Sequence, residues 1–388
     1  MNRRISGSPK RRIALLSRSL FPHAAHVAYL EHAALAPLAL PVTAAVQRFL
    51  AERSGPVPND IPSHFAAYER VRAGAAALIG APVEHVELAP STSWGLNLLA
   101  LGYPWQPGDR VAVPACEFPA NAFPWLQLSR FGVEVDLVPH TRGVVTVEDI
   151  EAALTSRTRL VAVSWVQYLS GYRLDLERLA EVVHAAGALL SVDATQGLGA
   201  LQLDVAVAGV DFMAAGAQKW LLAMQGAAIV YVAPALQERL APIRGWLNGP
   251  MAPDEEMDFA GALHPDARRF RVTAPAMEPV IALDASLAML RDAGAPAVEH
   301  AVVGSATRLA RGLDRAGLRR YGADEVSSGI VTFDHPDPAG AHAALREAGV
   351  HASVRNRRLR FSPHAYNDDD EIDLAIDVLS KARVGGLV

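Results

Sequence analysis

The chain has 388 residues, enough for two domains or for one large domain with an appendage. Hydrophobic residues make up 51% and charged residues 20%, which excludes an intrinsically disordered chain. The formal net charge of -5 argues against non-specific nucleic-acid binding, and no apolar run approaches the roughly 20 residues that span a membrane. A single cysteine, Cys116, excludes an internal disulfide framework and a cysteine-rich metal site.

Lysine is scarce in this chain. Of the 36 Lys and Arg residues only three are lysines, Lys10, Lys219 and Lys381, and two of these lie near the termini. A GC-rich genome explains the scarcity, because Arg replaces Lys wherever either will do. Arg cannot replace a lysine whose neutral amine must attack a carbonyl carbon, so codon bias and a chemical role for Lys219 remain equal alternatives at this point.

The N-terminal residues 1–28 begin with a basic, polar stretch and show no apolar core of a signal peptide. They predict a flexible lead and a cytoplasmic protein. Apolar positions then recur at helical spacing from Pro41 to Glu52 and from His64 to Ile79. The stretch between them is rich in Pro and Gly and predicts a loop.

Short apolar runs alternate with amphipathic stretches through the middle of the chain. The amphipathic stretches Asn121–Phe131 and Asp175–Ala186 predict helices. This alternation indicates an α/β domain with a largely parallel sheet, which binds ligands at the carboxyl ends of its strands. The apolar runs that predict buried strands are Arg110–Ala115, Val133–Pro139, Arg159–Val166, Ala188–Ala194, Asp211–Ala217 and Ala227–Val232.

The last third of the chain has the pattern of a smaller α+β domain. A long helical region from Pro275 to Arg315 is followed by a strand in GIVTFDH and a helix from Pro338 to Ala348. Two short strands, His351–Val354 and Leu359–Phe361, precede a final helix from Asp368 to Arg383. The predicted organisation is a lead (1–28), a segment packing with the small domain (29–55), a large α/β domain (56–270) and a small α+β domain (271–388).

Three segments of the large domain carry candidate chemistry. Lys219 follows an apolar strand among small residues, where desolvation exposes the neutral amine needed for a Schiff base; the alternative is an amine that reaches solvent. Asp193 ends the run ALLSVDA, where a carboxylate needs a cationic partner; the alternative is a cap of the next turn. The hydroxyls of Pro90–Asn97 precede a helical run and form either a phosphate site or an ordinary N-cap.

Together, the hydroxyl-rich helix start, the strand-end Asp193 and the lone Lys219 have the layout of a pyridoxal phosphate site on an α/β sheet. The chain resembles the class V aminotransferase group of fold-type I pyridoxal phosphate enzymes, which includes cysteine desulfurases, kynureninases and isopenicillin N epimerase-like proteins. The most specific segment is SWVQYLSGYRLDLERLAEVVHAAGALLSVDATQGLGALQLDV followed by AGAQKW. The resemblance implies an amino-acid substrate, pyridoxal 5'-phosphate and a homodimer with active sites at its interface, without nucleic-acid or membrane partners.

The same resemblance implies roles for individual residues. Lys219 corresponds to the Schiff-base lysine and proton shuttle, and Asp193 to the partner of the pyridine nitrogen. For the substrate, Arg360 in RFSPHAYN corresponds to the residue that grips the α-carboxylate, with Arg355 and His32 as weaker candidates. The remaining cofactor contacts are Thr92, Ser93 and Gln218 at the phosphate, Gln167 and Gln196 at the ring hydroxyl edge, Phe118 stacked on the ring, and Thr273 at the neighbouring subunit's phosphate.

Departures from the family pattern bear on the reaction. Relatives that transfer sulfur need a cysteine before the final Arg segment, and Gly349–Arg360 contains none, which disfavours a cysteine desulfurase. Cys116 reads instead as a buried thiol. Phe118 stands where relatives often have His, and Phe cannot transfer protons. An aminotransferase is therefore the leading hypothesis, with a lyase or epimerase and a non-catalytic cofactor-binding relative as alternatives. The loop from Trp246 to Ala267 is expected to line the substrate pocket.

Overall fold

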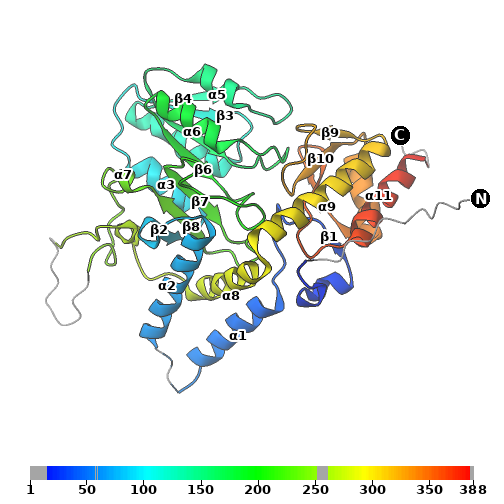
Figure 1. Cartoon of the computed structure of the whole chain (residues 1–388), viewed down its shortest axis with the longest axis horizontal. Coiled ribbons are helices and arrows are strands. Elements are labelled where there is room, and N and C mark those ends of the chain that lie inside the picture. The colour runs from blue at the N-terminus through cyan, green and yellow to red at the C-terminus, as the bar shows by residue number, and fades with distance from the viewer. Residues whose placement is uncertain (1–14, 57, 59, 251–260, 385–388) are drawn as a thin grey trace, which may run out of the picture.

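The computed structural model describes residues 15–56, 58, 60–250 and 261–384, so parts of the predicted lead and of the predicted pocket loop lie outside the described residues. A seven-stranded sheet lies in the larger part of the molecule, with the strand order β2-β8-β7-β6-β5-β3-β4 (Figure 1). The strands are β2 (Val86–Ala89), β3 (Arg110–Pro114), β4 (Glu134–Val138), β5 (Thr158–Ser164), β6 (Leu189–Asp193), β7 (Phe212–Gly216) and β8 (Ala228–Val232).

The predicted mostly parallel sheet is confirmed. Strands β3 to β7 pair in parallel, whereas β8 is antiparallel to both of its neighbours. All six predicted strands are present, each within two residues of its predicted bounds. Every residue of β7 and β8 is buried, as expected for strands that are covered on both faces. The edge strand β2 was not predicted, because four residues give too short a pattern.

Helices connect these strands. The predicted helix Asn121–Phe131 is wrong as a single element, because the segment is divided into three short pieces. Pro124 lacks a backbone N–H and stands at the second position of α4, so it suits the start of a helix and cannot continue one from Asn121. The elements here are η3 (Val83–His85), α3 (Thr92–Gly102), η4 (Pro119–Asn121), α4 (Phe123–Leu126), η5 (Gln127–Phe131), α5 (Val147–Ala153), α6 (Leu176–Ala185), α7 (Pro234–Gln237) and η6 (Ala267–Phe270).

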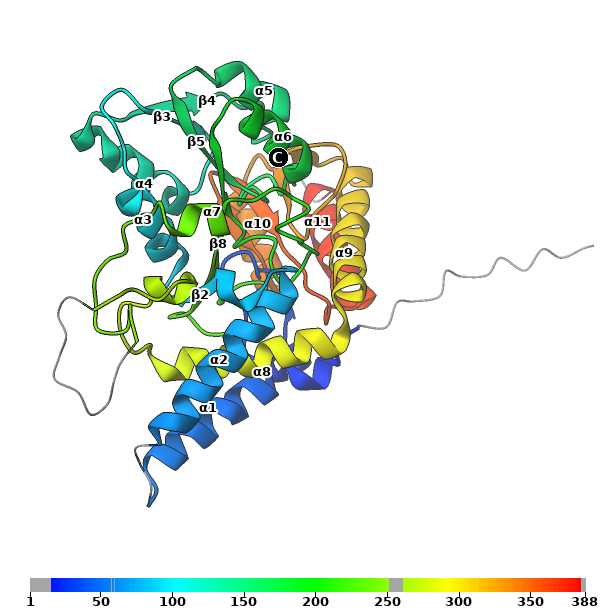
Figure 2. The same cartoon turned by 60° about the vertical axis from the view of Figure 1, so that its left-hand side comes forward.

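Three long helices lie side by side below the large sheet (Figure 2): α1 (Leu40–Arg53), α2 (Ile61–Leu78) and α8 (Met277–Ala293). Helix α9 (Ala295–Arg315) follows α8 after a sharp bend. The bend divides the long helical region that the sequence predicts, because Gly294 has a φ of 82°, which is outside the helical range.

The smaller part contains a four-stranded antiparallel sheet in the order β12-β13-β10-β9 and a parallel pair of β1 with β11. This pair joins the N-terminal segment to the C-terminal third. Within the predicted lead, residues 18–25 form two short 3-10 helices joined at Phe21. The Phe21 ring stacks on Tyr366 at 3.9 Å between ring centroids, which packs this segment against the C-terminal third. The elements are η1 (Arg18–Leu20), η2 (Pro22–Ala25), β1 (Ala28–Tyr29), β9 (Arg319–Tyr321), β10 (Val331–Asp334), α10 (Pro338–Glu347), β11 (Val350–His351), β12 (Ser353–Arg355), β13 (Arg358–Phe361) and α11 (Asp369–Val384).

None of the described helices is long and apolar enough to cross a membrane.

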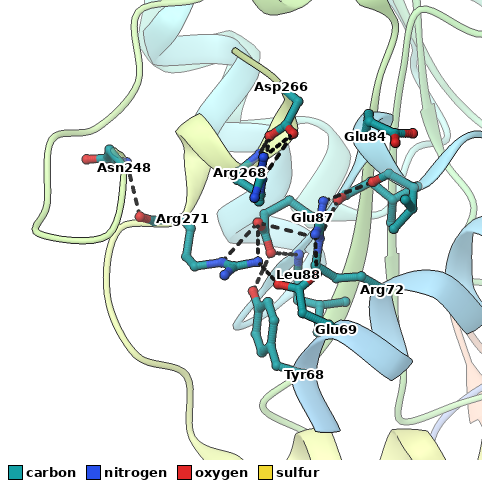
Figure 3. Close-up of polar contacts among 12 residues, drawn as sticks. Tyr68, Glu69, Arg72, Glu84, Glu87, Leu88, Asn248, Asp266, Arg268 and Arg271 are labelled. Carbon is teal, nitrogen blue, oxygen red and sulfur yellow. Dashed lines mark hydrogen bonds and ion pairs between the residues drawn. The ribbon is translucent and has the colours of Figure 1, made fainter. Parts of the chain in front are cut away.

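A buried ion cluster joins α2, β2 and the segment that follows η6 (Figure 3). Arg271 donates to Glu87 at 3.1 Å and to Glu69 at 2.9 Å, and the Tyr68 hydroxyl donates to Glu87. Burial raises the pKa of Glu87, and the charges of Arg271 and Arg72 oppose this rise. The cluster therefore fixes the segment that leads from η6 to α8.

Tyr68→Phe should lower the free energy of unfolding by about 1.5–3 kcal/mol, because it removes a hydrogen bond to a buried charged group. Denaturant unfolding of both proteins measures the difference. Tyr103→Phe is the control: the Tyr103 hydroxyl accepts from Arg239 at an exposed position, where such a bond contributes about 0–1 kcal/mol. Equal losses in the two variants would contradict a stabilising role for the buried cluster.

Candidate active site

Asp193 and Lys219 lie at the carboxyl edge of the large sheet, as predicted. Asp193 is the last residue of β6 and pairs with Ala214 of β7, and Lys219 follows β7 by three residues. A pocket of about 120 Å³ opens beside them. Its lining comes from the strand ends, the start of α3 and the turn before η4: Ser91, Thr92, Ser93, Phe118, Ala120, Ser164, Tyr168, Asp193, Thr195, Gln196, Gln218 and Lys219.

The environment of Lys219 favours a neutral amine. Burial lowers its pKa to about 8, and the charges of Arg360 and Arg355 act in the same direction. The charge of Asp193 opposes this shift but does not overcome it. The amine also lies 5.5 Å from the ring centroid of Phe118. About a tenth of Lys219 is therefore unprotonated at pH 7, far more than for an ordinary lysine, and this fraction can act as a nucleophile or base.

Asp193 is a buried carboxyl group beside that amine. One of its oxygens accepts a hydrogen bond of 2.9 Å from the backbone N–H of Thr195. Burial raises its pKa, although the Thr195 hydrogen bonds and the charge of Lys219 oppose the rise. The carboxylate is thus incompletely compensated within the protein, and a cationic N–H group in the pocket would stabilise it.

The start of α3 forms an anion cradle. Ser91 caps the helix by accepting from the backbone N–H of Trp94, and the Thr92 hydroxyl lies 2.9 Å from the Thr195 hydroxyl. The Gln218 side chain lies beside Gly216 near the start of α3: a Cβ added at Gly216 would stand only 2.6 Å from Gln218 Oε1. Glycine at position 216 therefore leaves room for the Gln218 amide beside a helix N-terminus, where backbone N–H groups attract anions.

The two glutamines predicted at the ring hydroxyl edge, Gln167 and Gln196, differ in position. Gln196 lines the pocket, but its amide is held from both sides: it donates to the Ala33 carbonyl at 3.0 Å and accepts from the Trp220 indole at 2.9 Å. Gln167 is not among the residues that line the pocket, and its Nε2 donates to Glu117 at 2.8 Å. The Gln196 amide is thus fixed before any ligand binds, whereas the Gln167 amide keeps an Oε1 without a hydrogen-bond partner.

Arg360 is a buried cation with unused hydrogen-bonding capacity. It is 2% exposed, donates from Nη1 to the Tyr168 carbonyl at 2.8 Å, and has an Nε without a partner. Burial lowers its pKa to about 10. Arg355 lies nearby at the exposed end of β12, and its charge lowers the pKa of both Arg360 and Lys219. A bound carboxylate would supply the partner that the Arg360 guanidinium lacks.

Three other predicted or notable residues lie outside the pocket lining. His32 is fully buried, with Nδ1 2.9 Å from the Ser362 carbonyl and Nε2 2.7 Å from the Tyr366 hydroxyl, so both ring nitrogens are engaged. Thr273 is exposed and accepts from the Trp246 indole at 3.0 Å. Burial, followed by the charge of the neighbouring Glu117, raises the pKa of the Cys116 thiol to about 12, so this thiol is unreactive.

Sequence reasoning missed four residues at or behind this pocket: Ser164, Tyr168, Thr195 and Glu117. The Tyr168 ring packs edge-on against Phe118 with 5.3 Å between centroids, and together they form one wall. Tyr168 and Thr195 are direct chain neighbours of Gln167 and Gln196, a signal that the sequence contains. Glu117 precedes Phe118 in CEFPANAFPW, and a charged residue in that apolar setting was the available signal.

A family model described as aminotransferase class-V matches residues 28–374. The chain belongs to this family. Among curated proteins, this class V chain is 30% identical over 311 residues to an uncharacterized aminotransferase, YcbU, of Bacillus subtilis, covering 80% of this chain and 82% of that protein. It is 28% identical over 387 residues to a probable cysteine desulfurase of Methanothermobacter thermautotrophicus, covering 91% and 94%.

Solved structures agree with this class V fold. The cysteine desulfurase CsdA of Escherichia coli superposes with a TM-score of 0.84 at 25% identity and covers 95% of this chain and 97% of its own. The apo cysteine desulfurase of Thermococcus onnurineus gives a TM-score of 0.86 at 23% identity, with the same coverage. The predicted fold-type I architecture is therefore confirmed.

Pyridoxal 5'-phosphate is the cofactor of this class V family, and the pocket fits it. The incompletely compensated Asp193 suits a protonated pyridine nitrogen, and the Lys219 amine suits a carbonyl carbon. The cradle of Thr92 and Gln218 at the α3 N-terminus suits a phosphate. Among the residues that the structure describes, no group of His, Cys, Asp or Glu side chains could hold a metal ion.

Proposed function

We propose that this class V enzyme is an amino-acid aminotransferase that works through a Schiff base between Lys219 and pyridoxal 5'-phosphate. The observation that carries the proposal is the convergence of three groups: the Lys219 amine with its lowered pKa, the buried Asp193, and the Arg360 guanidinium with its unpaired Nε. A cofactor, a proton acceptor and a carboxylate receptor are what amino-group transfer requires.

Each pocket residue has a place in this proposal. Thr92, Ser93 and Gln218 would hold the phosphate, and Asp193 would pair with the pyridine nitrogen, whose protonated form lets the ring withdraw electrons. Phe118 covers the ring face, and its lack of a proton-transferring group leaves Lys219 as the base. Gln167 and Gln196 would contact the ring hydroxyl edge. Thr273 would reach the phosphate of the second subunit.

Lys219 moves the proton of the substrate. Because burial lowers the pKa of Lys219 to about 8, its Nζ can accept a proton from the substrate Cα and return it at a different atom. Arg360 meanwhile holds the α-carboxylate, which fixes the Cα–H bond relative to that amine. His32 has both nitrogens engaged in buried contacts, so we assign it to positioning the segment that holds Gln196 through Ala33.

A lyase without a cysteine nucleophile is the second candidate. The sole thiol, Cys116, has a pKa raised to about 12, and this argues against sulfur transfer through a cysteine persulfide. A cystine C–S lyase with bound cysteine persulfide superposes with a TM-score of 0.86 at 20% identity, covering 93% of this chain and 99% of its own. This likeness shows the shared fold, and Lys219 and Arg360 are sufficient for elimination as well as for transamination.

Incubating the cofactor-loaded enzyme with single amino acids tests the proposal. Transamination requires an added keto acid and yields a new amino acid, whereas elimination releases ammonia and a keto acid without one. Turnover that depends on the keto acid supports the aminotransferase. Ammonia release in its absence favours the lyase. Failure of any amino acid to exchange its Cα hydrogen with deuterated water would overturn both and favour a cofactor-binding protein without activity.

We also propose that two copies form a homodimer that completes the pocket. A larger hollow of about 570 Å³ adjoins the pocket, sharing Ser93, Phe118 and Ala120 with it, and its rim includes the exposed ring of Phe123. A surface this apolar beside a cofactor pocket is suited to cover by another subunit. Light scattering of the purified protein tests the dimer. The predicted cytoplasmic location stays a prediction.

Gly216→Ala should weaken cofactor binding about tenfold. The added Cβ would stand 2.6 Å from Gln218 Oε1 and 2.9 Å from Thr92 Oγ1, which displaces both proposed phosphate ligands. Crowding of this kind costs about 1–3 kcal/mol, and about 1.4 kcal/mol is a factor of ten in affinity. Titration of the cofactor-free protein with pyridoxal 5'-phosphate measures the affinity. Gly74→Ala in α2, where a Cβ meets Leu287 at 3.4 Å, is the control, and equal affinities would contradict the cradle.

A further inference from the structure

Glu117 is a buried acid that the proposed reaction does not use. It lies between β3 and η4, and its carboxylate accepts hydrogen bonds from three donors. The backbone N–H of Ser164 donates at 2.7 Å, the Gln167 amide at 2.8 Å, and the Ser164 hydroxyl donates to the second oxygen. The carboxylate thus joins the end of β5 to the loop that carries Gln167.

Glu117 also lies beside the charged centre of the pocket. Ser164, which donates to it twice, is the direct neighbour of Asp193 in the sheet. Burial and the charge of Asp193 raise the pKa of Glu117 to about 7, against the opposing effect of its donors. The other titratable groups here are Lys219, whose charge interacts with Asp193, and the Cys116 thiol, which stays protonated and neutral because its pKa is about 12.

Gln167 has an unsatisfied acceptor. Its side chain is 4% exposed, its Nε2 donates to Glu117, and its Oε1 has no hydrogen-bond partner. An ionised carboxylate only accepts, so the amide must turn Nε2 toward Glu117 and leave Oε1 unpaired. A protonated Glu117 carries an O–H that can donate to Oε1. The amide can then reverse and present Nε2 on its other side.

We propose that Glu117 is a positioning residue whose protonation sets the direction of the Gln167 amide. With Glu117 ionised, Gln167 presents an acceptor away from it; with Glu117 protonated, Gln167 presents a donor. The proton comes from solvent and resides on a Glu117 carboxyl oxygen. This proposal rests on the proposed function, in which Gln167 would contact the ring hydroxyl edge. Gln167 would then donate a hydrogen bond to the cofactor's ring oxygen at lower pH and accept one at higher pH.

Infrared titration of the cofactor-free protein tests the switch, because the carbonyl stretch of a protonated carboxyl group reports Glu117 directly. We expect a titration step near pH 7 in the wild type that Glu117→Gln abolishes. Gln167→Leu should move the step upward by about one pH unit, because it removes a donor that stabilises the ionised form. Glu148→Gln, at an exposed pair with Arg178, is the control and should leave the step unchanged.

The visible absorption band of the cofactor-loaded protein provides the second measurement. Its shape should change across the same pH range in the wild type and not in Glu117→Gln or Gln167→Leu. A step that survives in Glu117→Gln, or that Gln167→Leu leaves in place or lowers, would overturn the proposal. If Glu117→Gln fails to fold, the direction of the shift in Gln167→Leu decides alone. The infrared measurement needs no cofactor, so its failure is distinguishable from failure of the proposed function.

Discussion

Lys219→Arg should reduce turnover about a thousandfold or more, although it keeps the positive charge. The guanidinium stays protonated, so it can neither attack the cofactor carbonyl nor accept a proton from the substrate Cα. General acid–base catalysis alone contributes about 10²–10⁴-fold. Steady-state turnover measures the loss, and borohydride reduction followed by mass spectrometry should show the cofactor attached to the wild type and not to the variant.

Lys381→Arg is the matched control, because this lysine lies at an exposed position on α11 and should leave turnover unchanged. In the wild type, the rate of cofactor attachment should rise with pH up to about 8 and level off above it, since the neutral amine of Lys219 is the nucleophile. Retention of more than a tenth of the activity in Lys219→Arg would refute the role of this amine.

Arg360→Met should lower kcat/KM for amino acids by about 10²–10³-fold. The substrate carboxylate would lose a buried charged partner, and truncating one member of such a pair costs about 2–5 kcal/mol. The loss should appear mainly in KM. Arg360→Lys should be intermediate, because an ammonium keeps the charge but not the planar fork that binds a carboxylate through two hydrogen bonds.

Comparison of two substrates makes this prediction specific. An amine without a carboxylate should be converted by the wild type and by Arg360→Met at similar low rates, since neither makes the contact. Arg311→Met, which changes an exposed arginine of α9, controls for the loss of a positive charge and should not affect kcat/KM. An equal loss for both substrates would assign Arg360 to folding of the Tyr168 segment, with which it shares a hydrogen bond.

The alternation of apolar and amphipathic stretches was sufficient to predict the large sheet, because buried parallel strands are short apolar runs. It failed where local chemistry overrides periodicity. Pro124 interrupts one predicted helix, and Gly294 divides another. These residues are visible in the sequence, but a proline that starts a helix and one that interrupts it look alike until the backbone is known.

Sequence patterns could predict those site residues that stand at the end of a strand or just after it. Asp193 and Lys219 follow apolar runs, so a parallel sheet brings them to one edge whatever the details of packing. Arg360 came from a resemblance, since no periodic pattern distinguishes a buried arginine from a surface one. Sequence patterns could not place His32 either, because its two buried hydrogen bonds, to Ser362 and Tyr366, join segments more than 300 residues apart.

The apolar runs that end at Asp193 and just before Lys219 were enough to predict that these two residues meet at the carboxyl edge of an α/β sheet. Their surroundings depend on the folded chain. Strand register and side-chain direction place Gln218 beside Gly216. They also bring Glu117 within hydrogen-bonding distance of Ser164 and Gln167. Hydrophobic periodicity is a local property of the chain, whereas these contacts join residues that only the folded sheet places side by side.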